Sequence, residues 1–262
     1  MICYNGNFQK EINLDITKNR GFLYGDGFFE TMLFTQGEVR FLENHLDRIC
    51  NSMVEFGFDL NTELFKLNIK NSLYSLIQHY YDSTKDYRIK LTVWRNPGGL
   101  YTPENNHFSY FIEPKLHSLL SDYREIEDLG ILTEGFFLPQ TIASNHKTIN
   151  SINYIQASRI KKNLKVDELI LLNSNNKICE ATCANIFWEK EGIFFTPSLS
   201  TGCIAGVRRQ NFIQQLITEK RVIKEGEYTL EEALAADKYI LTNALSIRVA
   251  KKIQEKSLPH LK

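Results

Sequence analysis

Apolar residues recur at helical spacing in the first half of the chain. The first set stands at positions i, i+3, i+4 and i+7: Leu46, Ile49, Cys50 and Met53. This spacing puts the four side chains on one face of a helix from about residue 44, which Gly57 ends. A second set predicts a helix at about 62–80: Leu73, Leu76, Ile77 and Tyr80.

Other stretches alternate apolar and polar residues, as half-buried strands do. Within residues 88–94, Ile89, Leu91 and Val93 fall on one face. Gln36-Gly37 joins strands at 31–35 and 38–42 into an expected hairpin. Further strands are expected at residues 2–8, 107–112, 130–138, 167–173, 177–188, 193–196 and 238–242.

Further helices are expected at about 150–164, from the turn at residues 201–209 to about 221, and after the capping-box residues 229–232. Groups of strands therefore alternate with groups of helices, without regular βαβ units. The pattern predicts a mixed α/β (α+β) fold.

The chain has 262 residues, more than one domain usually holds. The best linker lies at residues 113–121, where Pro114 separates two self-sufficient sets of elements. We expect an N-terminal α/β domain at 1–115, a linker at 116–122 and a C-terminal α/β domain at 123–262 that carries the candidate lysine Lys147.

Charge and composition narrow the class of partner. Lysine plus arginine equals aspartate plus glutamate, 31 each, so no global field favours nucleic acid or an anionic membrane. The longest apolar runs fall short of the roughly 18 residues that span a bilayer, and the N-terminus lacks the pattern of a secretory signal. Five cysteines without zinc-ligand spacing predict reduced thiols, no metal and a cytoplasmic location. A small anionic ligand fits best.

Three features carry candidate chemistry. Lys147 is a candidate amine nucleophile, although a lone lysine is usually a solvated surface residue. Glu180 stands among small and apolar residues, where a buried carboxylate without a partner would be costly. Gly206 lies in a turn before a helix, and the free N–H groups at such a helix start favour phosphate.

The order of five segments resembles the fold-type IV pyridoxal phosphate enzymes, also called the class IV aminotransferase family, over nearly the whole chain. The segments are Tyr24–Thr31, His45–Arg48, Lys147–Asn150, Glu180 with Ala184–Phe187, and Thr196-Pro197 followed by Gly206–Arg208. The resemblance implies the two-domain fold of D-amino acid aminotransferase-like proteins, with pyridoxal 5'-phosphate as cofactor. It also implies a homodimer whose site lies at the domain interface, partly covered by the partner subunit.

The resemblance assigns roles to single residues. Lys147 becomes the Schiff-base lysine and the acid/base on the substrate carbon, and Glu180 pairs with the pyridine nitrogen of the cofactor. The cofactor phosphate is assigned to four residues: Arg48, Gly206, Val207 and Asn243. A solvent-facing helix residue is the ordinary alternative for Arg48. Arg208 stands where many transaminases of the family have threonine, which removes a hydroxyl contact.

Four residues are implied around an amino-bearing small-molecule substrate: Tyr24, Phe28, Glu30 and Arg95. Arg95 is the best candidate for a substrate carboxylate because its guanidinium is charged and planar. Tyr24 and Phe28 are equally compatible with core positions.

The activity stays open between two kinds of enzyme. The compact length and the Asn243-Ala244-Leu245 segment resemble the lyases of the family. Leu100 departs from them, because lyases often carry an arginine and a glycine before the tyrosine of this loop. A lyase is the preferred interpretation, and the alternative is an amino-acid transaminase of branched-chain or D-amino-acid type. A non-catalytic cofactor-binding or regulatory protein is the third possibility.

Overall fold

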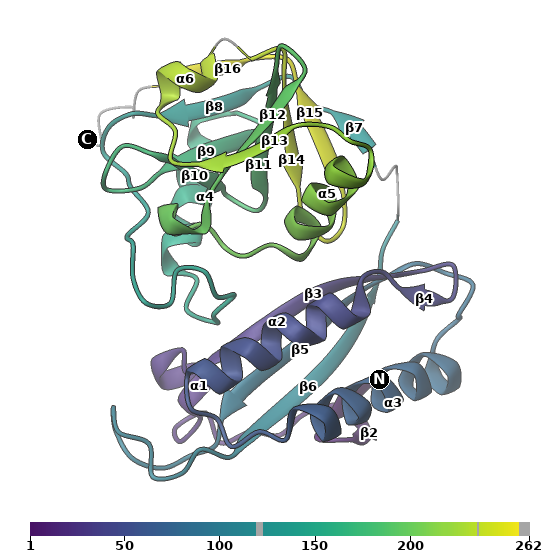
Figure 1. The fold of residues 1–262 in the computed structure, drawn as a ribbon. Helices are drawn as coiled ribbons and strands as arrows, with labels where there is room; N and C mark the ends of the chain where they lie inside the picture. The colour runs from purple at the N-terminus through teal and green to yellow at the C-terminus, as the bar shows by residue number, and fades with distance from the viewer. Residues whose placement is uncertain (119–122, 235, 257–262) are drawn as a thin grey trace. The chain divides into compact units, whose positions relative to one another are not determined.

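The computed structural model describes residues 1–118, 123–234 and 236–256, which pack into two units (Figure 1). Unit 1 is Met1–Leu120 with His146–Asn150, and unit 2 is Ser121–Asn145 with Ser151–Lys262. Residues 119–122 of the predicted linker lie outside the described residues. The segment with Lys147 packs within unit 1, whereas the sequence interpretation gave it to the C-terminal domain.

Unit 1 is an antiparallel sheet with helices. Its strands pair in the order β2-β1-β6-β5-β3-β4. The strands are β1 (Ile2–Tyr4), β2 (Asn7–Gln9), β3 (Gly27–Thr35), β4 (Glu38–Val39), β5 (Tyr87–Arg95) and β6 (Phe108–Leu116). The helices are α1 (Arg20–Tyr24), α2 (Leu42–Glu55) and α3 (Thr62–Tyr80). The helices predicted at about 44 to 57 and at 62–80 are confirmed, as is the turn at Gln36-Gly37.

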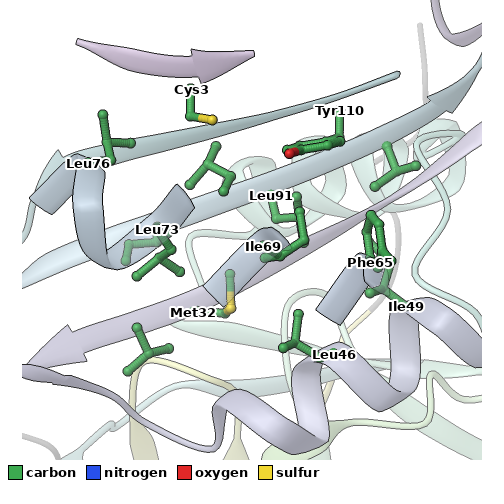
Figure 2. Packing of buried hydrophobic residues seen from close by; sticks show 14 of the residues in the cluster. Cys3, Met32, Leu46, Ile49, Phe65, Ile69, Leu73, Leu76, Leu91 and Tyr110 are labelled. Carbon is green, nitrogen blue, oxygen red and sulfur yellow. The ribbon is translucent and has the colours of Figure 1, made fainter. Parts of the chain in front are cut away.

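The core of unit 1 lies between the sheet and helices α2 and α3 (Figures 1 and 2). Figure 2 shows Leu46 and Ile49 of α2 and Leu73 of α3 pointing into the same cluster as Met32 of β3 and Leu91 of β5. All five side chains are buried. The helical periodicity therefore marks the two faces that cover the sheet.

Two expectations in unit 1 are wrong in detail. Residues 2–8 form a hairpin instead of one strand, because Asn5 and Gly6 both take positive φ, 47° and 83°, and turn the chain. Strand β6 continues through Pro114 to Leu116, so the linker proposed from residue 113 begins too early. Proline is tolerated because β6 pairs with β1 only at residues 111 and 112, which leaves one edge open at Pro114.

Unit 2 contains two sheets that enclose a common core. One sheet has the strand order β10-β9-β8-β16 and the other β13-β12-β11-β14-β15-β7. The strands are β7 (Tyr123–Glu125), β8 (Leu129–Leu132), β9 (Glu168–Leu172), β10 (Ile178–Ala181), β11 (Asn185–Lys190), β12 (Ile193–Pro197), β13 (Ile223–Gly226), β14 (Lys238–Thr242), β15 (Ile247–Ala250) and β16 (Ile253–Lys256).

Helices cover the outer faces of both sheets of unit 2. Helix α4 (Ile152–Leu164) packs on the first sheet through Ala157, and α5 (Val207–Thr218) packs on the second through Leu216. A short helix η1 (Leu199–Thr201) and α6 (Leu230–Leu234) complete the unit. The layers of unit 2 follow in the order helix, sheet, sheet, helix. This arrangement confirms the mixed α/β class.

Two strand predictions in unit 2 are wrong in extent. The strand expected at 130–138 ends at Leu132. The strand expected at 177–188 divides into β10 and β11, which belong to different sheets. The division follows from the turn that joins Ala181 to Ala184 by a backbone hydrogen bond of 2.7 Å. Alternation along the sequence does not reveal such a change of sheet.

No helix among the described residues is long and apolar enough to cross a membrane.

Candidate active site

Lys147 lies in a short segment that extends the sheet of unit 1. The backbone N–H of Phe29 donates to the oxygen of Lys147 at 2.9 Å, and the N–H of Ile149 donates to the oxygen of Gly27 at 2.9 Å. Phe28 and Thr148 form an antiparallel bridge between these bonds. The lysine backbone is therefore fixed on the edge of β3, the strand that begins with the glycine-rich segment.

Gly27 makes this close approach possible. A Cβ atom at Gly27 would lie 2.2 Å from the backbone oxygen of Val93 and 2.6 Å from Cδ1 of Ile149. Both distances are far below van der Waals contact. The last glycine of Gly25-Asp26-Gly27 is thus required where β5, β3 and the lysine segment meet.

Phe29 borders the side chain of Lys147, and the neighbouring His146 packs against two further phenylalanines. The side-chain nitrogen of Lys147 lies 4.5 Å from the centre of the Phe29 ring. His146 contacts the rings of Phe28 and Phe56, and its Nδ1 lies 2.8 Å from Oγ of Ser52. Sequence reasoning missed His146, although its position next to Lys147 was a usable signal. Phe28 is 3% exposed and belongs to the core, the alternative left open for it.

Glu30 and Arg48 form a buried ion pair. Nε of Arg48 donates to Oε1 of Glu30 at 2.7 Å, and a terminal nitrogen donates to Oε2 at 2.5 Å. His45 Nδ1 lies 2.7 Å from the same Oε2. Burial acts to raise the pKa of Glu30, but the charge of Arg48 and the hydrogen bonds with His45 and Arg48 outweigh it and lower the pKa to about 2. Glu30 therefore orients Arg48, and their predicted contacts with substrate and phosphate stay predictions.

Arg95 is held by groups of its own unit. Its guanidinium lies 4.0 Å from the centre of the Phe58 ring. It donates to Oδ2 of Asp26 at 3.1 Å and also to the Asn106 side chain and the main-chain oxygens of Phe56 and Gly57. These contacts give Arg95 a structural role, and its binding of a substrate carboxylate stays a prediction.

Arg20, which sequence reasoning did not single out, holds the loop that carries Leu100. Its NH1 donates to the main-chain oxygens of Gly98, Gly99 and Leu100 at 3.0, 3.2 and 2.6 Å. Its Nε donates to Asp26 at 2.8 Å.

Tyr24 borders the same loop. The Arg20 guanidinium lies 5.0 Å from the centre of the Tyr24 ring, and the Tyr101 ring lies 5.9 Å from it. Leu100 and Tyr101 are 74% and 89% exposed. The loop thus has a fixed backbone and exposed apolar side chains.

Glu180 lies in unit 2, where a bulge in β10 shifts the register between Ile178 and Glu180. The carboxylate is 3% exposed. One oxygen accepts a short hydrogen bond from the hydroxyl of Tyr154. The other accepts from the backbone N–H of Ile204 at 3.1 Å and from Nδ2 of Asn185 at 3.3 Å. These three donors fix the orientation of the carboxylate.

Asn185 connects Glu180 to the start of α5. Its Nδ2 also donates to the oxygen of Ile204 at 2.9 Å. A Cβ atom at Gly206 would lie 1.9 Å from the side-chain oxygen of Asn185, so only glycine fits there. Gly206 is the N-cap of α5 and Val207 its first residue. Glu180 and the predicted phosphate turn therefore share one rigid support within unit 2.

Asn243 shapes the turn that follows β14. Its Oδ1 accepts from the N–H groups of Leu245 and Ser246, both at 3.0 Å, and its Nδ2 donates to the oxygen of Cys183 at 3.1 Å. The side chain is thus used within unit 2, and its predicted phosphate contact stays a prediction. Beside it, Thr242 Oγ1 is buried without a hydrogen-bond partner among the described residues.

The two units divide the predicted site residues between them. Unit 1 holds Lys147, Arg48, Tyr24, Phe28, Glu30 and Arg95, and unit 2 holds Glu180, Gly206, Val207 and Asn243. Unit 1 pairs the Lys147 segment with Phe28 through Thr148 and brings Glu30 to Arg48. Unit 2 brings Glu180 to the turn at Gly206 through Asn185.

Comparison with known proteins identifies a family. The sequence pattern of the family "amino-transferase class IV" matches residues 27–253. The chain is 27% identical over 260 residues to aminodeoxychorismate lyase of Vibrio harveyi, covering 94% of this chain and 88% of that protein. It is also 27% identical over 249 residues to a putative branched-chain-amino-acid aminotransferase of Methanocaldococcus jannaschii, covering 92% and 83%.

The fold agrees as well. The crystal structure of 4-amino-4-deoxychorismate lyase from Pseudomonas aeruginosa superposes with a TM-score of 0.82 at 20% identity, covering 100% of this chain and 94% of that chain. The chain belongs to the class IV aminotransferase family, whose members use pyridoxal phosphate. It is an enzyme of this family, either an aminodeoxychorismate lyase or an aminotransferase.

Proposed function

We propose that this chain is a pyridoxal-phosphate-dependent lyase that converts 4-amino-4-deoxychorismate to 4-aminobenzoate and pyruvate, a step of folate biosynthesis. The observation that carries the lyase assignment is the turn built by Asn243. The side-chain oxygen of Asn243 accepts hydrogen bonds from the N–H groups of Leu245 and Ser246, and its side-chain nitrogen donates to the main-chain oxygen of Cys183. A threonine, which the transaminases carry here, has a shorter side chain with a single oxygen for all three bonds.

Three features of unit 2 support binding of pyridoxal phosphate. Glu180 is a buried, oriented carboxylate that suits a protonated ring nitrogen. Gly206 has no room for a Cβ at the N-terminus of α5, where backbone N–H groups suit phosphate. The buried hydroxyl of Thr242, which pairs with Asn185 in the sheet, supplies one more polar group.

In this proposal the bound cofactor withdraws electrons from the substrate carbon that bears the amine. Lys147 would hold the cofactor, and its amine would be the base that removes the proton from the amine-bearing ring carbon. The carbon–oxygen bond at the adjacent carbon would break as the ring becomes aromatic. The departing enolpyruvate would take up the proton and tautomerise to pyruvate.

The other residues of the proposal hold the reactants. Glu180 would keep the ring nitrogen protonated, and the N–H groups at Gly206 and Val207 would hold the phosphate. Arg48, which Glu30 orients, is the predicted side-chain ligand of the phosphate. Tyr24 lies beside the Leu100 loop and is a predicted substrate contact. We also propose a homodimer, which light scattering of the purified protein tests.

A class IV amino-acid transaminase of branched-chain or D-amino-acid type is the second candidate. Leu100 favours it, because the loop lacks the arginine that many lyases carry there. The equal identity to the Methanocaldococcus jannaschii protein points the same way. A transaminase needs the same lysine and carboxylate, so only the substrate separates the two activities.

The test is an absorbance spectrum of the purified protein with pyridoxal 5'-phosphate, followed by 4-amino-4-deoxychorismate and an assay for both products. A visible band that is absent in Lys147→Ala, together with 4-aminobenzoate and pyruvate, supports the lyase. The band without products, but with keto acid from an L- or D-amino acid, supports the transaminase. Absence of the band in the wild type contradicts both.

A further inference from the structure

Tyr154 lies in the first turns of α4 and reaches Glu180 on β10. Its hydroxyl donates a short hydrogen bond to Oε1 of the carboxylate. The ring packs against a cluster of buried residues that includes Cys179 and Cys203. Burial raises the pKa of the Tyr154 hydroxyl, and the neighbouring Glu180 raises it further, so the hydroxyl keeps its proton and remains a donor.

Three donors to Glu180 come from separate elements of unit 2. Tyr154 belongs to α4, Asn185 to β11, and Ile204 to the connection before α5. Asn185 and Ile204 both bond to Oε2, whereas Tyr154 bonds to Oε1. The phenol adds a donor on the other oxygen and so further defines the rotation of the carboxylate about its last bond.

A phenol also tunes the carboxylate without neutralising it. A hydroxyl donor stabilises the anion and lowers its proton affinity, but leaves its negative charge in place. A carboxylate that lost this donor would compete more strongly for the proton of any cationic partner. Loss of this donor would therefore affect both the direction and the basicity of the carboxylate.

We propose that Tyr154 is a positioning residue that fixes and tunes Glu180 as the partner of the cofactor ring nitrogen. The inference rests on the proposed binding of pyridoxal phosphate and deepens it, since it adds a tyrosine of α4 to the support of the cofactor. Tyr154 acts through Glu180 and takes no part in proton transfer to the substrate.

The test compares Tyr154→Phe with the wild type and with Tyr228→Phe. The Tyr228 hydroxyl donates to the oxygen of Lys224 within unit 2, so this variant loses a tyrosine hydroxyl elsewhere in the unit. Two quantities are measured: the dissociation constant of pyridoxal 5'-phosphate from the cofactor-free protein, and the pH at which the visible band of the loaded protein changes. The melting temperature of each cofactor-free variant is recorded as well.

We expect Tyr154→Phe to bind the cofactor about tenfold more weakly, as loss of one hydrogen bond to a charged group predicts. The visible band should also change at a higher pH. Without the Tyr154 donor, Glu180 draws the proton of the ring nitrogen more strongly, so the ring carries less positive charge. A less positive ring raises the pKa of the lysine nitrogen attached to the cofactor. Tyr228→Phe should leave both quantities unchanged. In a Glu180→Ala background, Tyr154→Phe should add no further effect.

A second variant tests the direction of the effect. Replacement of Tyr154 by 3-fluorotyrosine keeps the ring and strengthens the donor, so the visible band should titrate at lower pH than in the wild type. The inference is overturned when wild-type protein has the band and both Tyr154 variants titrate as the wild type does. A wild type without the band overturns the proposed function and this inference together.

Discussion

The main-chain oxygen of Lys147 accepts a hydrogen bond of 2.9 Å from Phe29, and its side-chain nitrogen lies 4.5 Å from the centre of the Phe29 ring. One residue of β3 thus holds the lysine backbone and borders its amine. This relationship places the candidate nucleophile on a sheet, where its position is set more tightly than on an isolated loop.

Replacement of the lysine tests the proposed chemistry directly. Lys147→Ala should lose the visible band and lower turnover by at least roughly a thousandfold, since both covalent attachment and proton transfer depend on the amine. The melting temperature of the cofactor-free protein should change little, because the backbone bonds of residue 147 remain. Absorbance, steady-state kinetics and thermal melting measure these effects. The exposed Lys10, changed to alanine, is the control, and retained turnover in Lys147→Ala would refute the assignment.

Gly27→Ala tests the close approach of three strands. The new methyl group would meet the oxygen of Val93 at 2.2 Å, and the backbone there cannot move aside cheaply. We expect a loss of about 2 kcal/mol in the free energy of unfolding, measured with urea on the cofactor-free protein, and weaker cofactor attachment at Lys147. Gly226→Ala is the matched control, because the atom it meets is the flexible end of Tyr228. Equal losses in the two variants would contradict this account.

The ion pair of Glu30 predicts a pH dependence of stability. Its pKa is lowered from 4.5 to about 2 in the folded protein. The stabilisation is therefore fully present above the unfolded pKa and is lost as the pH falls toward 2. We expect Glu30→Gln to lower the free energy of unfolding by about 3 kcal/mol at neutral pH, and by progressively less below about pH 4.5. Urea unfolding at several pH values measures the difference. Exposed Glu38→Gln serves as control, and a difference independent of pH would argue against the ion pair.

Arg20→Lys tests the support of the Leu100 loop. Lysine keeps a positive charge near Asp26 but cannot reproduce the planar guanidinium, whose NH1 bonds three successive main-chain oxygens while Nε bonds Asp26. Backbone amides at residues 98–101 should exchange hydrogen severalfold faster, which mass spectrometry follows. Under the proposed function, KM should rise severalfold with a smaller change in kcat. Arg88→Lys, at an exposed position on β5, should leave exchange in the loop unchanged; unchanged exchange in Arg20→Lys itself would exclude this role.

Local patterns predicted the helices α2 and α3 and the turn at Gln36-Gly37. The apolar spacing of Leu46, Ile49 and Met53 marks α2, and the same argument applies to α3. Asn5-Gly6 carried a hairpin signal that was read as the middle of a strand. Family resemblance pointed to Lys147 and Glu180, which lie in fixed and partly or wholly buried positions. Their roles rest on the proposed function.

Other features left no local signal in the sequence. Tyr154 and Glu180 are 26 positions apart, and Arg20 and Leu100 are 80 apart. Neither spacing belongs to a helix or a hairpin. The pairing of Arg48 with Glu30 was also not predicted. The sequence interpretation assigned Arg48 to the cofactor phosphate and Glu30 to the substrate. Residues 177–188 divide into β10 and β11 because the two strands pair in different sheets, and no local pattern shows with which strands each of them pairs.

The sequence alone therefore determined the helices α2 and α3, the turn at Gln36-Gly37 and the mixed α/β class. These depend on side chains a few positions apart, whose spacing and backbone preferences act within one element. Only the tertiary structure decided that Lys147 joins the sheet of unit 1, that Glu30 holds Arg48 and that Tyr154 holds Glu180. Such contacts depend on which distant elements exclude water together, and burial then requires each polar group to find a partner within reach.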